Sequence, residues 1–159
     1  MDPELLERYR QIGLRLDREG RFWLEGEPVL HAGIIAALHR MIDRLEDGRF
    51  AVRLDAERYA YLEVEDAPFQ VRSVAVERGA ESPLLFLTLD DESEEELRYG
   101  TLRVGPDDAL YCEVKEGRFE ARFSRAASRQ LGELIEELEG EDSGFGLRAA
   151  GRLWPIRGG

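Results

Sequence analysis

The sequence predicts an α+β protein with mainly antiparallel strands and helices that cover them. Three observations lead to this class. Two stretches carry apolar residues at helical spacing, a long middle stretch alternates apolar and polar residues, and one strand-helix-strand pattern occurs twice. With 159 residues, of which 43% are hydrophobic, the chain is long enough to form a single compact protein over residues 1–159.

Three helices are expected from local signals. Asp2 is a good N-cap and Pro3 suits a first helical position, so a short helix is expected there. Its apolar stripe would consist of Leu5, Leu6, Tyr9 and Ile12. Two longer amphipathic helices are expected over about residues 31–45 and 125–138, because apolar residues recur there three and four positions apart. We expect these two helices to cover the strands.

Strands are expected wherever the apolar period changes to two. A first short strand follows Gly20, and several antiparallel strands fill residues 49–89. Three more are expected at residues 101–104, 110–114 and 118–123, and a final pair at 144–156. The acidic stretch 90–96 between them is expected to be a solvated surface loop or one helical turn. Its carboxylates could coordinate Ca²⁺ or Mg²⁺, but the spacing of an EF-hand is lacking, so solvated charge is favoured.

An internal repeat is the most informative feature of the chain. The sequence Glu-Gly-Arg-Phe at residues 19–22 returns at residues 116–119, and residues 46–53 resemble residues 141–148. The shift along the chain that aligns residues 19–22 with residues 116–119 also aligns the apolar positions of the two longer helices. We therefore expect two repeated strand-helix-strand motifs, in halves that span about residues 15–89 and 97–157.

Composition excludes several classes of protein. The net charge of −12 makes sequence-independent binding of nucleic acid a poor expectation. Cys112 is the only cysteine, so no disulfide forms within the chain and a cytoplasmic location is expected. No apolar run approaches the roughly 20 residues of a membrane span, and no secretory signal is recognisable.

The sequence offers no catalytic constellation and no metal site. His31 and His39 are eight residues apart on one expected helix and cannot share a metal ion, so structural roles are favoured, with His31 near the helix start and His39 on the polar flank. The string at residues 144–149 matches a dinucleotide-binding pattern, but a helix precedes it and a strand follows, which is the wrong order. Cys112 is expected to be a buried thiol within a strand. No cofactor is expected.

Five residues are candidates for a ligand site because they lie at corners and element ends. Glu65, Asp66 and Phe69 flank Pro68, which is expected to bend the chain between two strands. Arg122 and Arg125 lie beside Ser124, a candidate N-cap, where free backbone N–H groups favour an anion. The corner at Glu65, Asp66 and Phe69 could instead be purely architectural. Arg122 and Arg125 could instead pair with surface carboxylates.

Several strings resemble a family of small bacterial proteins known as domain of unknown function 1285. They are residues 20–26, 64–69, 102–104 and 120–125, in that order, and the likeness covers about residues 15–156. The resemblance implies a distorted, partly closed barrel with repeated motifs, no established activity, and a suggested role in signal transduction. This sequence departs from the expected family pattern after Arg125, where Ala126 and Ala127 stand in place of proline and aromatic residues.

These observations together predict a non-enzymatic ligand-binding or regulatory module. A groove between the two halves would hold a small anionic ligand or a segment of a protein partner, bound by Glu65, Asp66, Phe69, Arg122 and Arg125. One alternative is an acid/base enzyme that uses Glu65 or Asp66, with Arg122 stabilising developing charge. Another is a protein-interaction subunit whose strand edges or acidic face dock a basic partner.

Overall fold

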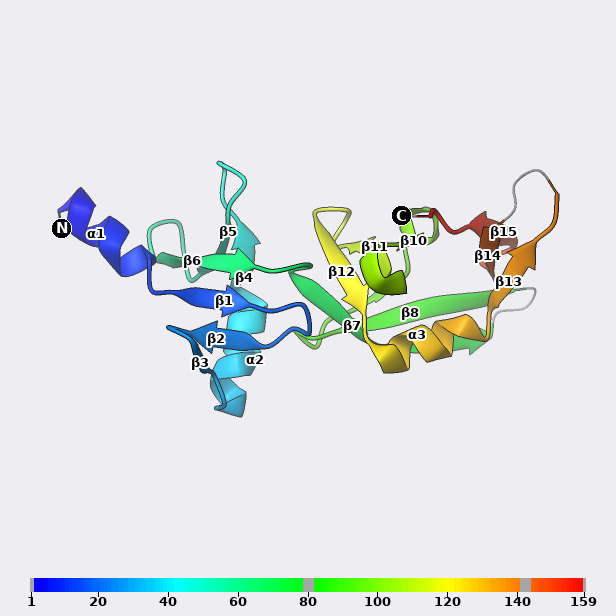
Figure 1. The fold of residues 1–159 in the computed structure, drawn as a ribbon, viewed down its shortest axis with the longest axis horizontal. Helices are drawn as coiled ribbons and strands as arrows, with labels where there is room; N and C mark the ends of the chain where they lie inside the picture. The colour runs from blue at the N-terminus through cyan, green and yellow to red at the C-terminus, as the bar shows by residue number, and fades with distance from the viewer. Residues whose placement is uncertain (1, 79–81, 141–143, 159) are drawn as a thin grey trace. The chain divides into compact units, whose positions relative to one another are not determined.

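The structure, a computed structural model, describes residues 2–78, 82–140 and 144–158 (Figure 1). The chain divides into two compact units, Met1–Pro68 and Phe69–Gly159, called unit 1 and unit 2 below. The division falls at the expected corner after Pro68, because the strand that begins at Phe69 pairs with strands of unit 2 on both of its sides. The repeat halves, about residues 15–89 and 97–157, stay a prediction.

Unit 1 is a six-stranded sheet with two helices (Figure 1). The strand order is β3-β2-β1-β6-β5-β4, and every neighbouring pair is antiparallel except β1 and β6, which are parallel. Helix α1 packs against β6, and α2 packs against β5. The bounds are α1 Pro3–Arg10, β1 Leu14–Leu16, β2 Phe22–Leu24, β3 Glu27–Pro28, α2 Ala32–Met41, β4 Ile42–Arg44, β5 Phe50–Arg53 and β6 Tyr59–Val64.

The starts of both helices in unit 1 follow from local sequence. The Asp2 carboxylate accepts the backbone N–H of Glu4 at 3.1 Å, and Pro3 opens α1 as predicted. His31 caps α2, because its Nδ1 accepts the backbone N–H of Ile34 at 3.2 Å. The predicted position of His31 near the helix start is therefore confirmed.

The end of α2 and the environment of His39 differ from prediction. The helix ends at Met41, and Ile42 is extended and begins β4, which pairs with β5. His39, predicted on the polar flank, is only 1% exposed and packs its ring 4.7 Å from that of Phe22. The apolar residue Ile34, predicted on the buried face, is 51% exposed. The buried side of the helix therefore includes His39 and leaves Ile34 exposed, while Ile35, Leu38 and Met41 of the predicted face are half-buried.

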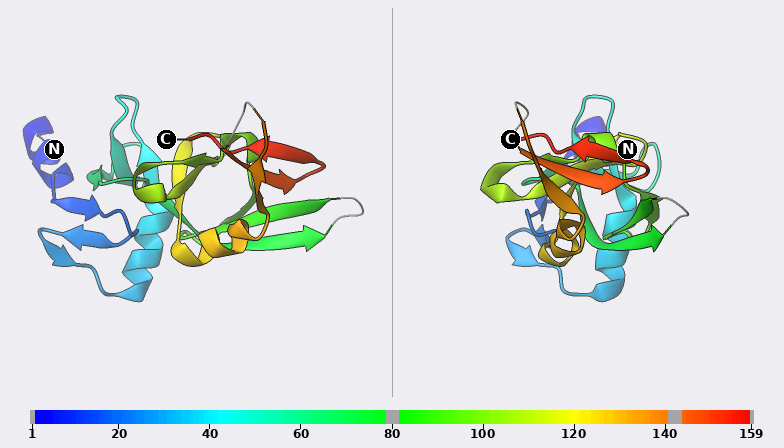
Figure 2. Two further views of the ribbon diagram at one scale, coloured as in Figure 1. Left: turned by 45° about the vertical axis from the view of Figure 1, so that its right-hand side comes forward. Right: turned by 90° about the vertical axis from the view of Figure 1, so that its right-hand side faces the viewer.

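Unit 2 contains a six-stranded sheet in the order β10-β11-β12-β7-β8-β9 and a three-stranded sheet in the order β13-β14-β15 (Figures 1 and 2). All neighbours are antiparallel except β12 and β7, which are parallel. Helix α3 packs against β7 and β12. The bounds are β7 Phe69–Arg78, β8 Pro83–Leu89, β9 Glu94–Glu96, the 3-10 helix η1 Tyr99–Thr101, β10 Arg103–Val104, the 3-10 helix η2 Pro106–Asp108, β11 Leu110–Val114, β12 Phe119–Phe123, α3 Arg125–Gly132, β13 Ile135–Leu138, β14 Gly144–Ala149 and β15 Arg152–Pro155.

Two elements of unit 2 are strands where the sequence suggested otherwise. The predicted helix 125–138 stops at Gly132, and Ile135–Leu138 forms β13, paired with β14. In the acidic stretch, Glu94–Glu96 forms β9 on the edge of β8, not a helical turn. In both places pairing with the neighbouring strand along the chain decides the conformation, and apolar periodicity does not reveal this pairing.

The α+β class is confirmed, and the pairing is mainly antiparallel. In the described ranges, however, neither six-stranded sheet closes on itself: the outermost strands are β3 and β4 in unit 1 and β10 and β9 in unit 2, and Arg157 forms a bridge to β10. The predicted partly closed barrel is therefore not confirmed. None of the helices in the described ranges is long and apolar enough to cross a membrane.

The two segments of the predicted repeat contain similar elements. Residues 14–64 run β1, β2, β3, α2, β4, β5, β6, and residues 110–155 run β11, β12, α3, β13, β14, β15. Gly20 and Gly117, at equivalent turns, have φ values of 83° and 81°. Residues 141–143 of the second copy lie outside the described residues. The duplication itself stays a prediction.

Candidate functional site

Glu65 of the predicted site is occupied by contacts within unit 1. Its carboxylate accepts the backbone N–H of Arg18 at 2.9 Å, and it lies 3.6 Å from the Arg18 guanidinium and 3.9 Å from that of Arg15. The backbone N–H of Glu65 donates to the carbonyl of Leu16 at 2.9 Å. These bonds fix the turn after β1 to the end of β6. Asp66, the next residue, is half-buried.

Phe69 and Arg122 lie in unit 2 but point to opposite faces of its larger sheet. Phe69 is 2% exposed, and its ring meets that of Phe119 edge-on with the centroids 5.3 Å apart. In the β12–β7 register Ala121 lies beside Phe69 and Arg122 beside Gln70, and neighbouring residues of a strand face opposite ways. Phe69 is therefore part of the core, and the two side chains do not converge.

The two predicted arginines have different surroundings. Arg122 Nη1 donates to the Tyr111 hydroxyl at 3.4 Å, across the β11–β12 pair. Arg125 is exposed at the first position of α3. The predicted cap is present, because Ser124 Oγ accepts the backbone N–H of Ala127 at 3.1 Å. The structure thus places Arg122 on β12 and Arg125 on α3.

The acidic stretch 90–96 is held by the only lysine of the chain. Lys115 Nζ donates to the Asp91 carboxylate and, at 3.0 Å, to Ser93 Oγ. Its backbone N–H donates to both carboxylate oxygens of Glu95, at 3.0 and 3.1 Å. Burial opposes ionisation of Asp91, but the bonds from Lys115 and Ser93 outweigh it and lower the pKa of Asp91. This stretch is therefore a bonded part of unit 2, unlike the solvated loop that was predicted.

Asp90 is a buried carboxyl that the sequence analysis missed. It is 6% exposed, and burial raises its pKa to about 7, against the attraction of Arg72. Its backbone N–H donates to the carbonyl of Gln70 at 3.0 Å, and Gln70 pairs with Arg122 in the sheet register. In the sequence Asp90 stands among five other acids, so nothing distinguished it from solvated neighbours.

Unit 1 contains a cavity of about 350 Å³ that the sequence analysis also missed. It lies where α1, the end of α2, β5, β6 and the turn between these two strands meet. Its apolar lining consists of Leu6, Met41, Val52, Leu54 and Ala60. Two tyrosines and three charged residues complete it, namely Tyr9, Tyr59, Arg10, Glu57 and Arg58. A mainly apolar cavity with a few converging polar groups is the usual form of a small-molecule site.

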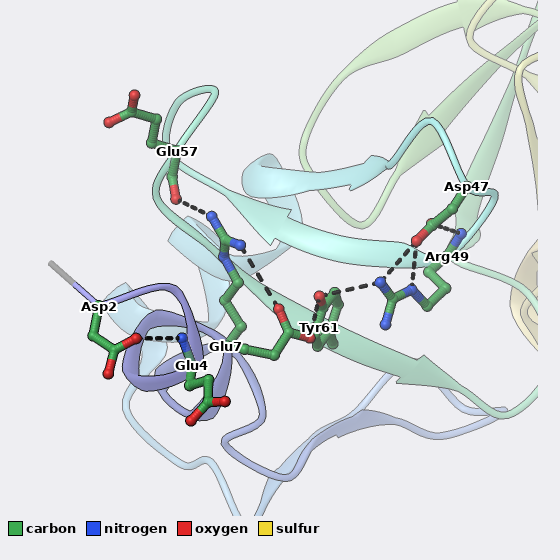
Figure 3. Close-up of polar contacts among 8 residues, drawn as sticks. Asp2, Glu4, Glu7, Asp47, Arg49, Glu57 and Tyr61 are labelled. Carbon is green, nitrogen blue, oxygen red and sulfur yellow. Dashed lines mark hydrogen bonds and ion pairs between the residues drawn. The ribbon is translucent and has the colours of Figure 1, made fainter.

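A chain of polar contacts joins the turn before β5 to helix α1 (Figure 3). Arg49 donates to Asp47 at 2.8 Å and to the Tyr61 hydroxyl at 3.1 Å, and that hydroxyl donates to Glu7 at 2.6 Å. The bond to Glu7 is the main reason that the pKa of Tyr61 is raised. Glu7 in turn lies 3.8 Å from Arg10 Nη1. Helix α1 is thereby fixed to β6 beside the cavity.

Arg10 is held in place at the wall of the cavity. Its Nη2 donates to the backbone carbonyl of Glu57 at 2.9 Å, and its guanidinium carbon lies 3.9 Å above the centre of the Tyr59 ring. The side chain is 16% exposed. Arg58, by contrast, is 73% exposed and bonds Asp55 at 2.7 Å. Arg10 is thus the inner cation of the cavity and Arg58 the outer one.

The described residues include no group of three or more His, Cys, Asp or Glu side chains arranged to hold a metal ion. Cys112 is a buried free thiol, as predicted, and burial raises its pKa. The fold and the cavity together define an α+β protein of two units, one of which carries an apolar cavity bordered by arginine.

Comparison with solved structures relates this fold to the family that the sequence resembles. A DUF1285 family protein from Silicibacter pomeroyi DSS-3 has a TM-score of 0.74 at 24% identity, over 92% of this chain and 80% of that one. A second, from Shewanella baltica OS155, has a TM-score of 0.60 at 16% identity, over 76% of this chain and 91% of that one. No protein-family model and no curated protein matches the chain. The chain thus has the fold of DUF1285 family proteins, which supports the resemblance seen in its sequence.

Proposed function

We propose that this protein is a non-enzymatic module that binds a small molecule in the unit 1 cavity. The observation that carries the proposal is the cavity itself, which has a volume of about 350 Å³ and an apolar lining with charged residues at one side. This volume lies within the range of about 300–1,000 Å³ that is usual for small-molecule sites.

The charged residues of the cavity suit binding better than proton transfer. Two of the three are arginines, and an arginine guanidinium does not lose its proton in proteins. Asp90, whose raised pKa would suit acid/base chemistry, is only 6% exposed and lies in unit 2. Glu65 already bonds the turn after β1. These contacts favour the binding module over the acid/base enzyme.

The proposal moves the binding site away from the residues that the sequence singled out. A site formed by Glu65, Asp66, Phe69, Arg122 and Arg125 stays a hypothesis. The same holds for docking of a basic protein partner and for a distorted barrel. The proposal also includes a regulatory role in signal transduction, which the family resemblance supports. It includes a cytoplasmic location, which the single cysteine supports.

A cavity-filling variant tests the proposal. Ala60 lines the cavity on β6, so Ala60→Leu places three further carbon atoms in the space that the ligand needs. Ala75→Leu is the matched control, because Ala75 is an exposed strand residue of unit 2. The measurement is the thermal unfolding of all three proteins against a library of small metabolites.

We expect at least one compound to raise the Tm of the wild-type protein and of Ala75→Leu but not of Ala60→Leu. At 100 times its Kd a ligand stabilises by about 2.7 kcal/mol. For a chain of this size, that corresponds to a rise of roughly 5–11 °C. A library without any such compound, or shifts that persist in Ala60→Leu, would contradict the proposal.

A further inference from the structure

We propose that the ligand of the unit 1 cavity is a small amphipathic anion whose charged group accepts a hydrogen bond from Arg10 Nε. This inference rests on the proposed function, because it names the chemistry of a ligand for the same cavity. Its grounds are the donors of Arg10, the charge around the cavity and the size of the apolar space.

The first ground is a buried donor. Arg10 Nε is buried and donates to no acceptor among the described residues. Its guanidinium is otherwise well placed, with Nη2 bonded to the Glu57 carbonyl at 2.9 Å and the plane over Tyr59. Buried donors in native proteins nearly always have an acceptor. Arg10 lines the cavity, and a ligand oxygen there would supply an acceptor once the side chain turns its Nε toward the cavity.

The second ground is incompletely neutralised charge. Arg10 forms an ion pair with Glu7, but the Glu7 carboxylate lies 2.6 Å from the Tyr61 hydroxyl and 3.8 Å from Arg10 Nη1. The Glu7 carboxylate therefore forms its shorter contact with Tyr61, and its ion pair with Arg10 is long. Of the two arginines that line the cavity, Arg58 bonds Asp55 at 2.7 Å. Arg10 is therefore the lining cation with the weaker ion pair.

The third ground is the size and lining of the space. At about 30 Å³ for each water-sized group, a cavity of 350 Å³ holds on the order of twelve non-hydrogen atoms. Leu6, Met41, Val52 and Leu54 would surround the apolar part of such a ligand. Leu54 is 68% exposed and Tyr9 is 64% exposed, so an apolar chain would also cover surface that now faces water. A medium-chain carboxylate such as decanoate has this size and this polarity.

The test compares three probes with the same chain length and different end groups. Decanoate, 1-decanol and decylammonium are titrated into the full-length protein by isothermal titration calorimetry. The concentrations stay below the micelle concentrations of the two ions and below the solubility limit of 1-decanol. We expect decanoate to bind more tightly than 1-decanol and decylammonium to bind most weakly. Arg10→Gln should weaken decanoate at least about tenfold, the effect of losing one charge-assisted hydrogen bond. It should leave the affinity for 1-decanol nearly unchanged.

Two further variants separate charge from folding. Arg8→Gln is the matched control, since Arg8 is an exposed residue of the same helix that does not line the cavity. It should bind decanoate as the wild-type protein does. Arg10→Lys retains the charge without the Nε donor and should bind with intermediate affinity. Retained binding of 1-decanol shows that the cavity of an Arg10 variant is intact.

The outcomes distinguish this inference from the proposed function. If all three probes bind equally, and Ala60→Leu abolishes all of them, the cavity binds ligands but the anion assignment is overturned. If none of the three probes binds, or if Ala60→Leu does not weaken their binding, the inference also fails. The library screen then tests the proposed function separately. A last experiment measures whether the protein sediments together with phosphatidylglycerol vesicles. If it does, and Arg10→Gln abolishes this binding, the assignment to a free small ligand is overturned.

Discussion

Replacement of Asp90 by Asn is expected to stabilise the protein in a strongly pH-dependent way. The Asp90 carboxyl is 6% exposed, and burial raises its pKa from 3.8 to about 7. The folded state therefore binds this proton more tightly than the unfolded state does. The favourable contribution is complete below about pH 4 and is lost as the pH rises from about 4 to about 7.

The size of the effect follows from this difference in pKa. Each pKa unit corresponds to about 1.36 kcal/mol, so a rise from 3.8 to about 7 corresponds to roughly 4 kcal/mol. Asn has nearly the same shape and carries no charge. The unfolding free energy of Asp90→Asn minus that of the wild-type protein should thus increase by up to about 4 kcal/mol between pH 4 and pH 8.

Urea unfolding at a series of pH values measures this difference. The quantity of interest is its change with pH, since any fixed loss of hydrogen bonding in Asp90→Asn cancels. Asp91→Asn is the matched control, because Lys115 and Ser93 lower the pKa of Asp91 against its burial. That variant should become less stable relative to wild type as the pH rises from acid to neutral. A flat difference for Asp90→Asn over this range would refute the reasoning.

Three further predictions concern unit 2. Lys115→Met should destabilise by about 3 kcal/mol in urea unfolding, because Asp91 loses its partner in a partly buried setting. Gly105→Ala should cost about 1–3 kcal/mol by the same assay, since an added Cβ would lie 2.4 Å from a ring carbon of Tyr111. Cys112 should react with a thiol reagent only on unfolding, because burial raises its pKa and covers its sulfur.

Each of these has its own control or contrary result. Gly132→Ala is the control for Gly105→Ala, because an added Cβ at Gly132 meets nothing within 4 Å. Equal stability of the two glycine variants would contradict the packing argument. Unchanged stability of Lys115→Met would mean that the acidic stretch is solvated. Rapid labelling of Cys112 in the native protein would contradict its burial.

Features that depend on neighbouring residues were predictable from the sequence. Asp2 and Ser124 cap α1 and α3 because a cap bonds an N–H only two or three residues away. The ends of the longer helices were not predictable in this way. Apolar residues at positions 134, 135 and 138 suit a helix or a strand, and pairing with β14 decides for the strand.

The sites depend on contacts that no local pattern contains. The cavity brings together residues of α1, the end of α2, and the turn between β5 and β6, so it exists only once unit 1 has folded. Asp90 is buried because the β7–β8 pair places it beside Gln70. Phe69 was expected at a ligand site because it follows a corner, but its ring packs in the core against Phe119.

The most direct test of a ligand site in unit 1 is a methyl NMR titration of the wild-type protein with decanoate. We predict shifts of the methyl groups that line the cavity, those of Leu6, Met41, Val52, Leu54 and Ala60. The methyl groups of Leu87 and Val114, fully buried in unit 2, should not shift. Shifts confined to unit 2, or none at concentrations where calorimetry detects binding, would contradict the account.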